Sequence, residues 1–204
     1  RKMMLYEKAG DRFMVLLSAG NLSISQSVRE ILQVEKLDNG HDAPITIWNA
    51  TSMFDAVRVL GSAVRRVYDQ DGPSLKQAGI DFNASMVFGG QIAGEHQRLF
   101  MVYAEGNFIE ATPETPYFQI GETKYGKPII DRVISAETCI DDAIKCVLVS
   151  FDSTMRSNLS VGMPLDLCVI PVNEFKAKTQ RIESDHKEFR QISDSWAASL
   201  RTAF

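Results

Sequence analysis

The sequence is poor in the residues that usually form disulfides or hold metal ions. It contains three cysteines, an odd number without CxxC spacing and in apolar surroundings: Cys139, Cys146 and Cys168. This pattern favours reduced thiols in the core over disulfides or a zinc site. The three histidines are far apart and occupy different kinds of segment: His41, His96 and His186. We therefore expect no metal centre and no other cofactor.

Long apolar runs and a concentration of one charge are also missing. The longest apolar run, LFMVYA at residues 99–104, is far shorter than the roughly 20 residues that span a bilayer, and the N-terminus lacks a signal-peptide layout. A net charge of −4 with scattered basic residues argues against a nucleic-acid or membrane-surface binder. With 45% hydrophobic and 24% charged residues, the composition is that of a folded globular protein, which we expect in the cytoplasm.

The first third of the chain predicts a hairpin followed by two helices. Alternating apolar residues on both sides of Gly10 indicate two strands joined by a tight turn. From Ser23 the apolar spacing becomes helical. A second helix begins near Ser52, which forms a capping-box pattern with Asp55. We expect this helix to end before the Asp-Gly-Pro sequence at residues 71–73.

The rest of the chain predicts strands, a helix pair, another strand and a tail helix. The strands of an antiparallel meander are expected at residues 84–92, 97–104 and 108–111. Helical spacing then begins near Pro128 and again near Ser135 or Thr138, where the stripe is the clearest in the chain. An apolar strand at 163–172 and an amphipathic helix at 183–204 follow.

The order of these elements predicts an α+β fold. The helices come in pairs and not singly between strands, which disfavours a doubly wound parallel sheet. Antiparallel sheets that pack together on one face and carry helix pairs on the other form a four-layer αββα sandwich. We expect one domain over residues 1–204, with a C-terminal helical extension at 182–204.

Three stretches resemble the proteasome-type N-terminal nucleophile (Ntn) hydrolases, most closely the bacterial ancestral beta subunit (Anbu) group. They are RKMMLYEKAGDRFMVLLSAGNLSISQSV, RLFMVYAEGNFIEATPETPYFQIGETKYGKPIIDRVI and STMRSNLSVGMPLDLCVI. YFQIGETKYGKP is the most specific piece. The resemblance implies the Ntn-hydrolase type of αββα sandwich and a peptidase whose first residue, a Thr, Ser or Cys, attacks the peptide carbonyl.

The resemblance also implies that the nucleophile is not in this sequence. In that family a hairpin carrying an Asp precedes the lysine strand that begins here, and Arg1 cannot act as the attacking residue. Lys2 matches the family's lysine, whose ammonium lowers the cost of forming an alkoxide. Gly20 matches the strand-to-helix turn whose amide stabilises the oxyanion. On the residues alone, Lys2 is an edge-strand lysine and Gly20 a helix-entry glycine.

The resemblance assigns further residues to substrate and nucleophile. The family's pocket for the side chain that precedes the cut bond corresponds to Met4, Ser18, Leu22 and Gln26; Met4 and Leu22 alone would be ordinary core residues. Ser157 and Ser160 align with polar residues that support the nucleophile's amine, although Ser157 stands where an acid is typical and loop serines often form turns. Glu122 follows Gly121, where relatives carry a serine, and could replace that hydroxyl or cap the next helix.

Three functions remain open at this point. The first is a self-assembled peptidase that acts on peptides or unfolded proteins, as a homo-oligomer in a ring or spiral, with or without an ATPase partner. The second is a non-catalytic assembly or binding subunit on the same fold. The third is a small-molecule amidase, which a deep polar pocket would mark. None of them involves nucleic acid or a membrane.

Overall fold

The computed structural model describes residues 2–38, 40 and 43–204, so His41 lies outside the described residues. Clustering of contacts divides the chain into two compact units. The first comprises Arg1–Ala111 and Ile170–Ala177, and the second comprises Thr112–Val169 and Lys178–Phe204. Both units combine antiparallel strands with helices.

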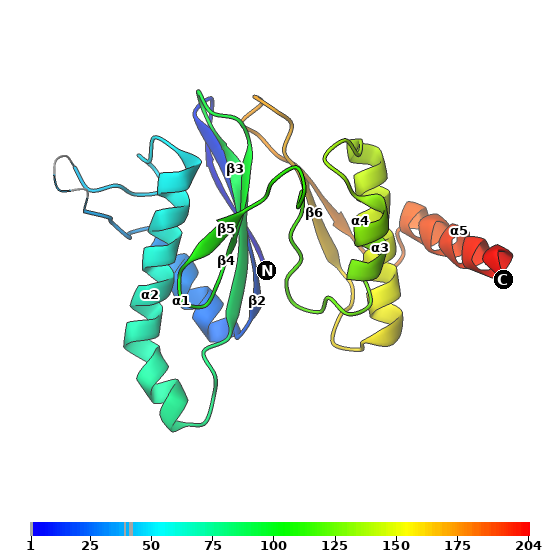
Figure 1. Cartoon of the computed structure of the whole chain (residues 1–204), viewed down its shortest axis with the longest axis horizontal. Coiled ribbons are helices and arrows are strands. Elements are labelled where there is room, and N and C mark those ends of the chain that lie inside the picture. Colours follow the sequence, from blue (N-terminus) through cyan, green and yellow to red (C-terminus); the bar gives the residue numbers. More distant parts are fainter. Residues whose placement is uncertain (1, 39, 41–42) are drawn as a thin grey trace. The chain divides into compact units, whose positions relative to one another are not determined.

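The first unit contains a five-stranded antiparallel sheet with the strand order β1-β2-β3-β4-β5 (Figure 1). Its strands are β1 (Met3–Lys8), β2 (Arg12–Gly20), β3 (Ala84–Ile92), β4 (Arg98–Val102) and β5 (Phe108–Glu110). Gly10, at a φ of 72°, forms the tight turn between β1 and β2. The hairpin and the meander predicted from alternating apolar residues are confirmed.

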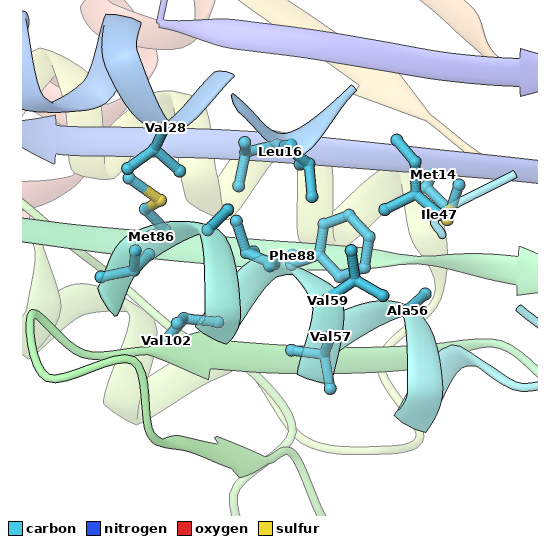
Figure 2. Close-up of a cluster of buried hydrophobic side chains, with 14 of the residues drawn as sticks. Met14, Leu16, Val28, Ile47, Ala56, Val57, Val59, Met86, Phe88 and Val102 are labelled. Atoms are coloured by element: carbon cyan, nitrogen blue, oxygen red, sulfur yellow. The ribbon is translucent and has the colours of Figure 1, made fainter. Parts of the chain in front are cut away.

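Two helices, α1 (Leu22–Leu32) and α2 (Met53–Gln77), pack against this sheet and form the larger core. Figure 2 shows Leu16 and Phe88 from the strands beside Val28 of α1 and Val57 of α2. All four side chains are at most 1% exposed. The helices therefore cover the sheet face that carries Leu16 and the even-numbered residues of β2.

The N-termini of both helices are capped by side chains. Asn21 Oδ1 accepts a hydrogen bond from the Ser23 N–H at 2.9 Å, and Ser52 Oγ accepts one from the Asp55 N–H at 3.0 Å. The predicted cap at Ser52 is thus confirmed. The predicted end before residue 71 is wrong, because α2 continues through Pro73 to Gln77. Pro73 is exposed there, so water can solvate the carbonyl that loses its helical partner.

The second unit contains three helices and a two-stranded antiparallel sheet. Its elements are α3 (Lys127–Val133), α4 (Ile140–Ser157), β6 (Leu165–Val169), β7 (Lys178–Ile182) and α5 (Lys187–Ala203). Gly126 lets the segment before α3 approach α4 closely, since a Cβ at this position would lie 2.1 Å from Ser150 Oγ. Strand β7 was not predicted: its sequence KTQRI is polar, and only Ile182 is buried.

Helix α5 docks on α4 of its own chain. Phe189 packs in the smaller core with Leu148, Leu165 and Ile182. The apolar stripe of the tail helix ends early, because Leu200 is 42% exposed and Phe204 is fully exposed. The first half of the predicted tail helix thus has a partner within the second unit.

The α+β class predicted from the element order is confirmed by the helices and antiparallel sheets. All three cysteines are free, as expected, but the prediction that all lie in the core is wrong for Cys139. Cys139 is exposed because it is the N-cap residue of α4, where its thiol donates to Asp142 Oδ2 at 3.3 Å. Among the described residues, no helix combines the length and apolar composition needed to cross a bilayer.

Candidate functional site

Lys2 lies beside Ser18 at the open end of the first hairpin. The Lys2 carbonyl oxygen accepts a hydrogen bond from the Ser18 N–H at 3.1 Å. The same register continues with Met4 opposite Leu16. Residues that pair directly across two strands share a sheet face, so Lys2, Met4 and Ser18 lie on the face that α1 covers. The Lys2 side chain is exposed.

Gly20 ends β2 on the same face, two residues beyond Ser18. At a strand rise of about 3.4 Å per residue, the two Cα atoms lie about 7 Å apart. Gly20 has a φ of 99°, and a Cβ there would lie 2.4 Å from the Asn83 carbonyl oxygen. That oxygen accepts a hydrogen bond from the Asn21 N–H at 2.8 Å. The turn into α1 therefore requires glycine for structural reasons, whatever its amide does chemically.

The remaining residues assigned to the substrate pocket flank this end of the sheet. Met4 is half-buried and packs on the edge of the larger core. Leu22, the first residue of α1, is 62% exposed and thus not a core residue. Gln26 follows one helical turn later and is also exposed. Leu22 and Gln26 share one side of α1 because residues four apart are neighbours on a helix surface.

The two serines matched to the family's amine-supporting residues lie in the second unit, where α4 ends. Ser157 is the last residue of α4 and is exposed. Asn158, its C-cap residue, accepts two hydrogen bonds at Oδ1, from the Ser160 N–H at 2.9 Å and from Ser160 Oγ–H at 2.7 Å. Ser160 therefore forms a turn, as the residues alone suggested, and its side chain is also held in one position.

Glu122 is joined to the same turn. Its Oε1 accepts a hydrogen bond from the Lys124 N–H at 2.9 Å, and its Oε2 accepts one from Asn158 Nδ2 at 2.8 Å. The Lys124 amide and the Asn158 side chain hold the pKa of the Glu122 carboxyl below its usual value. Glu122 thus binds an amide three residues before α3 instead of capping the helix itself.

The structure brings the assigned residues together in two groups. Lys2, Met4, Ser18, Gly20, Leu22 and Gln26 gather at one end of the sheet in the first unit. Ser157, Ser160 and Glu122 gather around Asn158 in the second unit. Sequence reasoning passed over Asn158, although an Asn directly after a helix and two residues before a Ser is a pattern typical of turns.

The geometry at Lys2 and Gly20 is suited to acyl transfer. The exposed ammonium of Lys2 and the amide of Gly20 lie on one sheet face and can flank a scissile carbonyl. The ammonium can then stabilise the attacking atom, and the amide can donate to the oxyanion. Within residues 2–38, 40 and 43–204, no three His, Cys, Asp or Glu side chains cluster in a way that could hold a metal ion.

Comparison with known proteins supplies relatives among solved structures. Anbu (ancestral beta-subunit) from Yersinia bercovieri is 46% identical, covers 100% of this chain and 83% of its own, and superposes with a TM-score of 0.89. Anbu from Hyphomicrobium sp. strain MC1 is 45% identical, with 100% and 84% of the two chains covered and a TM-score of 0.87. The Anbu complex from Pseudomonas aeruginosa, which forms a helical assembly, is 41% identical, with 100% and 83% covered and a TM-score of 0.89. No protein-family model and no curated protein matches the chain.

Proposed function

Because the chain belongs to the Anbu (ancestral beta-subunit) group of proteasome-like Ntn hydrolases, we propose that it is a peptidase subunit that cleaves peptide bonds. The attacking group is the hydroxyl or thiol of an N-terminal Thr, Ser or Cys. That residue is not among these 204, and the proposal therefore requires one in the mature protein. Peptides or unfolded proteins are the substrates.

The observation that carries the proposal is the shared position of Lys2 and Gly20. The pairing of Lys2 with Ser18 places the lysine two strand residues from Gly20, on the same sheet face. In this proposal one scissile carbonyl lies between the two groups, with its carbon toward the Lys2 ammonium and its oxygen toward the Gly20 N–H. The adjacent Met4, Leu22 and Gln26 would then contact the side chain that precedes the cut bond.

The reaction has two stages. In the first, the nucleophile adds to the carbonyl carbon while its proton passes to its own α-amine, and the Gly20 N–H stabilises the negative oxygen. The ammonium of Lys2 stabilises the deprotonated nucleophile. The proton then moves to the leaving nitrogen as the C–N bond breaks and an acyl-enzyme forms. In the second stage, water hydrolyses this intermediate by the same proton route. Ser157 and Ser160 are assigned to support the α-amine.

The proposal also covers the fold, the domain organisation, the assembly and the location of the protein. The fold is a four-layer αββα sandwich of the Ntn-hydrolase type, and residues 1–204 form one domain. Residues 182–204 form its C-terminal extension. The subunit works as a homo-oligomer in the cytoplasm; the helical assembly of the Pseudomonas aeruginosa relative supports oligomerisation.

Covalent labelling of the full-length protein tests this function. We expect a peptide epoxyketone or vinyl sulfone to add one equivalent to the first residue, detected by intact-protein and peptide mass spectrometry. A heat-unfolded sample serves as the control for nonspecific alkylation. A mature N-terminus without Thr, Ser or Cys, or a native protein that gains no adduct, would favour the non-catalytic assembly subunit instead.

A further inference from the structure

The second unit contains a pocket of about 310 Å³ whose lining residues have no role in the proposed function. Its apolar wall is formed by Met155 of α4, Met163 of the segment between α4 and β6, and Phe189 of α5. Both methionines are only partly buried at the edge of the smaller core, so they present apolar surface to a ligand. The volume is close to the lower limit of ~300–1,000 Å³ for small-molecule sites, which favours a small ligand.

Two exposed side chains of opposite charge, Arg190 and Asp194 of α5, also line this pocket. Arg190 donates from Nη2 to the Ser184 carbonyl oxygen at 3.2 Å, which leaves the other N–H groups of the guanidinium for a ligand. Asp194 has no hydrogen-bonding or ionic partner in the part of the chain that the structure describes. The pocket therefore offers one cation and one anion to a ligand that carries both charges.

The spacing of these two charges fits one small zwitterion. Residues four apart are neighbours on a helix surface, with Cβ atoms about 5–6 Å apart, so Arg190 and Asp194 can flank a single group. A guanidinium donates two parallel hydrogen bonds to a carboxylate, and a carboxylate accepts from an ammonium. A free α-amino acid carries a carboxylate and an ammonium on the same carbon atom, and its side chain leaves that carbon in another direction.

The buried polar residue of the lining has its partners within the protein. Ser193 donates its hydroxyl to Asp152 Oδ1 at 2.8 Å and accepts a hydrogen bond from Arg156 Nη2 at 2.9 Å. It therefore has no hydrogen left to donate to a ligand. A polar ligand side chain placed against the apolar wall would lose water without gaining a partner, which costs free energy. The wall consequently selects an apolar side chain.

We propose that this pocket binds a free α-amino acid with an apolar side chain. The ligand's carboxylate binds the Arg190 guanidinium, its ammonium binds the Asp194 carboxylate, and its side chain contacts Met155 and Met163. Because methionine side chains adapt their shape, the pocket accepts apolar side chains of several shapes. Peptide degradation releases such amino acids. Binding at this pocket requires no peptide cleavage, so its test is separate from that of the proposed function.

A bound amino acid should also stabilise the second unit. The lining comes from α4, from the segment that follows it and from α5, so the ligand contacts all three segments at once. Any ligand that binds only the folded state raises the free energy of unfolding in proportion to the logarithm of its concentration. The melting temperature should therefore rise with the concentration of the amino acid, and amide hydrogen exchange in α5 should become slower.

Isothermal titration calorimetry of the full-length protein with L-leucine tests the site. We expect one molecule bound per chain. L-Leucinamide, which lacks the carboxylate, and N-acetyl-L-leucine, which lacks the ammonium, should each bind at least about tenfold more weakly. L-Serine, which keeps both charges but has a polar side chain, should also bind about tenfold more weakly or worse, because burial of the leucine side chain is lost.

Variants of the two charged residues locate the site. Arg190→Gln and Asp194→Asn should each weaken L-leucine binding about tenfold or more. Arg201→Gln, which removes an exposed cation from the same helix outside the pocket, is the matched control and should change the affinity by less than about twofold. All three positions are exposed, and thermal unfolding without ligand checks that each variant folds.

Several outcomes would overturn the inference. A wild-type protein that shows neither heat of binding nor a higher melting temperature with L-leucine has no such site. Equal binding of N-acetyl-L-leucine would remove the ammonium and Asp194 from the recognition. Unchanged affinity in Arg190→Gln or Asp194→Asn would show that L-leucine binds elsewhere. A protein that binds L-leucine as expected but gains no adduct from the vinyl sulfone keeps this site and loses the proposed function.

Discussion

Ser193 of α5 donates its hydroxyl to Oδ1 of the buried Asp152 of α4, at 2.8 Å. Arg156 completes the cluster, since its Nε donates to Asp152 Oδ2 at 3.0 Å and its Nη2 to Ser193 Oγ at 2.9 Å. A buried carboxylate is stable only when it is paired and hydrogen-bonded. The cluster therefore specifies how the first half of α5 lies on α4.

Replacing Asp152 by alanine should loosen this helix. Ser193 then loses its acceptor in a buried position, and we expect a cost of about 2 kcal/mol in the free energy of unfolding. Urea denaturation measures the loss, and amide hydrogen exchange should become faster in α5 than in α4. Asp194→Ala, at an exposed neighbouring position, is the control and should change stability by less than about 0.5 kcal/mol. Equal effects of the two variants would contradict the assigned role.

Removal of the Lys2 amine tests the proposed catalytic group. In the full-length protein, Lys2→Ala should lower the rate of peptide cleavage about a hundredfold or more, with an unchanged melting temperature because the side chain is exposed. Lys2→Arg should not restore the rate, since a planar, delocalised guanidinium cannot place its charge as a compact ammonium does. Lys8→Ala, at the exposed far end of the same strand, should retain full activity. A fully active Lys2→Ala protein would exclude the lysine from the mechanism.

Alanine at Gly20 should cost more stability than alanine at Gly10. Both glycines have positive φ, at 99° and 72°, but only at Gly20 would a Cβ meet backbone, 2.4 Å from the Asn83 oxygen. We expect Gly20→Ala to cost about 3 kcal/mol and Gly10→Ala about 1 kcal/mol. Chemical denaturation of the two variants gives both values. Similar costs would show that the turn into α1 can shift away from Asn83.

Tyr6→Phe should be neutral or stabilising at pH 7. The Tyr6 hydroxyl is buried and has no hydrogen-bond partner among the described residues, so its removal leaves no other group unpaired. Burial raises the pKa of Tyr6 from 10.0 to about 12. The folded state thus favours the neutral phenol. The resulting contribution to the free energy of unfolding is fully present below pH 10 and is lost between about pH 10 and 12. Wild type should lose about 2 kcal/mol more than Tyr6→Phe over that range, as alkaline denaturation can measure. Parallel stability curves would contradict the raised pKa.

Thiol labelling should distinguish the three cysteines. Cys139 is exposed and should react with iodoacetamide in the native protein at pH 8. Burial raises the pKa of Cys146 and of Cys168, which lowers the fraction of reactive thiolate at each. Mass spectrometry of native and urea-unfolded samples should show Cys139 labelled first and the other two only on unfolding. Early labelling of Cys146 would indicate opening of α4.

The sequence by itself determined the elements whose side chains repeat with a regular period. Leu16 in an alternating strand and Val57 in a helical stripe are buried where the pattern predicts, because burial of one face is a local property of each element. The turn at Gly10 also determines which residue lies opposite Lys2, since a tight hairpin leaves one register. The catalytic roles of Lys2 and Gly20, by contrast, rest on family resemblance.

Only the tertiary structure decided the features that depend on distant partners. Strand β7 is polar and forms because it pairs with β6, and α2 passes through Pro73 because an exposed position tolerates one missing hydrogen bond. The Asn158 side chain is held by Glu122. The loop before α3 brings Glu122 Oε2 to 2.8 Å from Asn158 Nδ2. No periodic pattern in the sequence predicts the path of this loop, because the partner of a polar side chain depends on position in space and not on spacing along the chain.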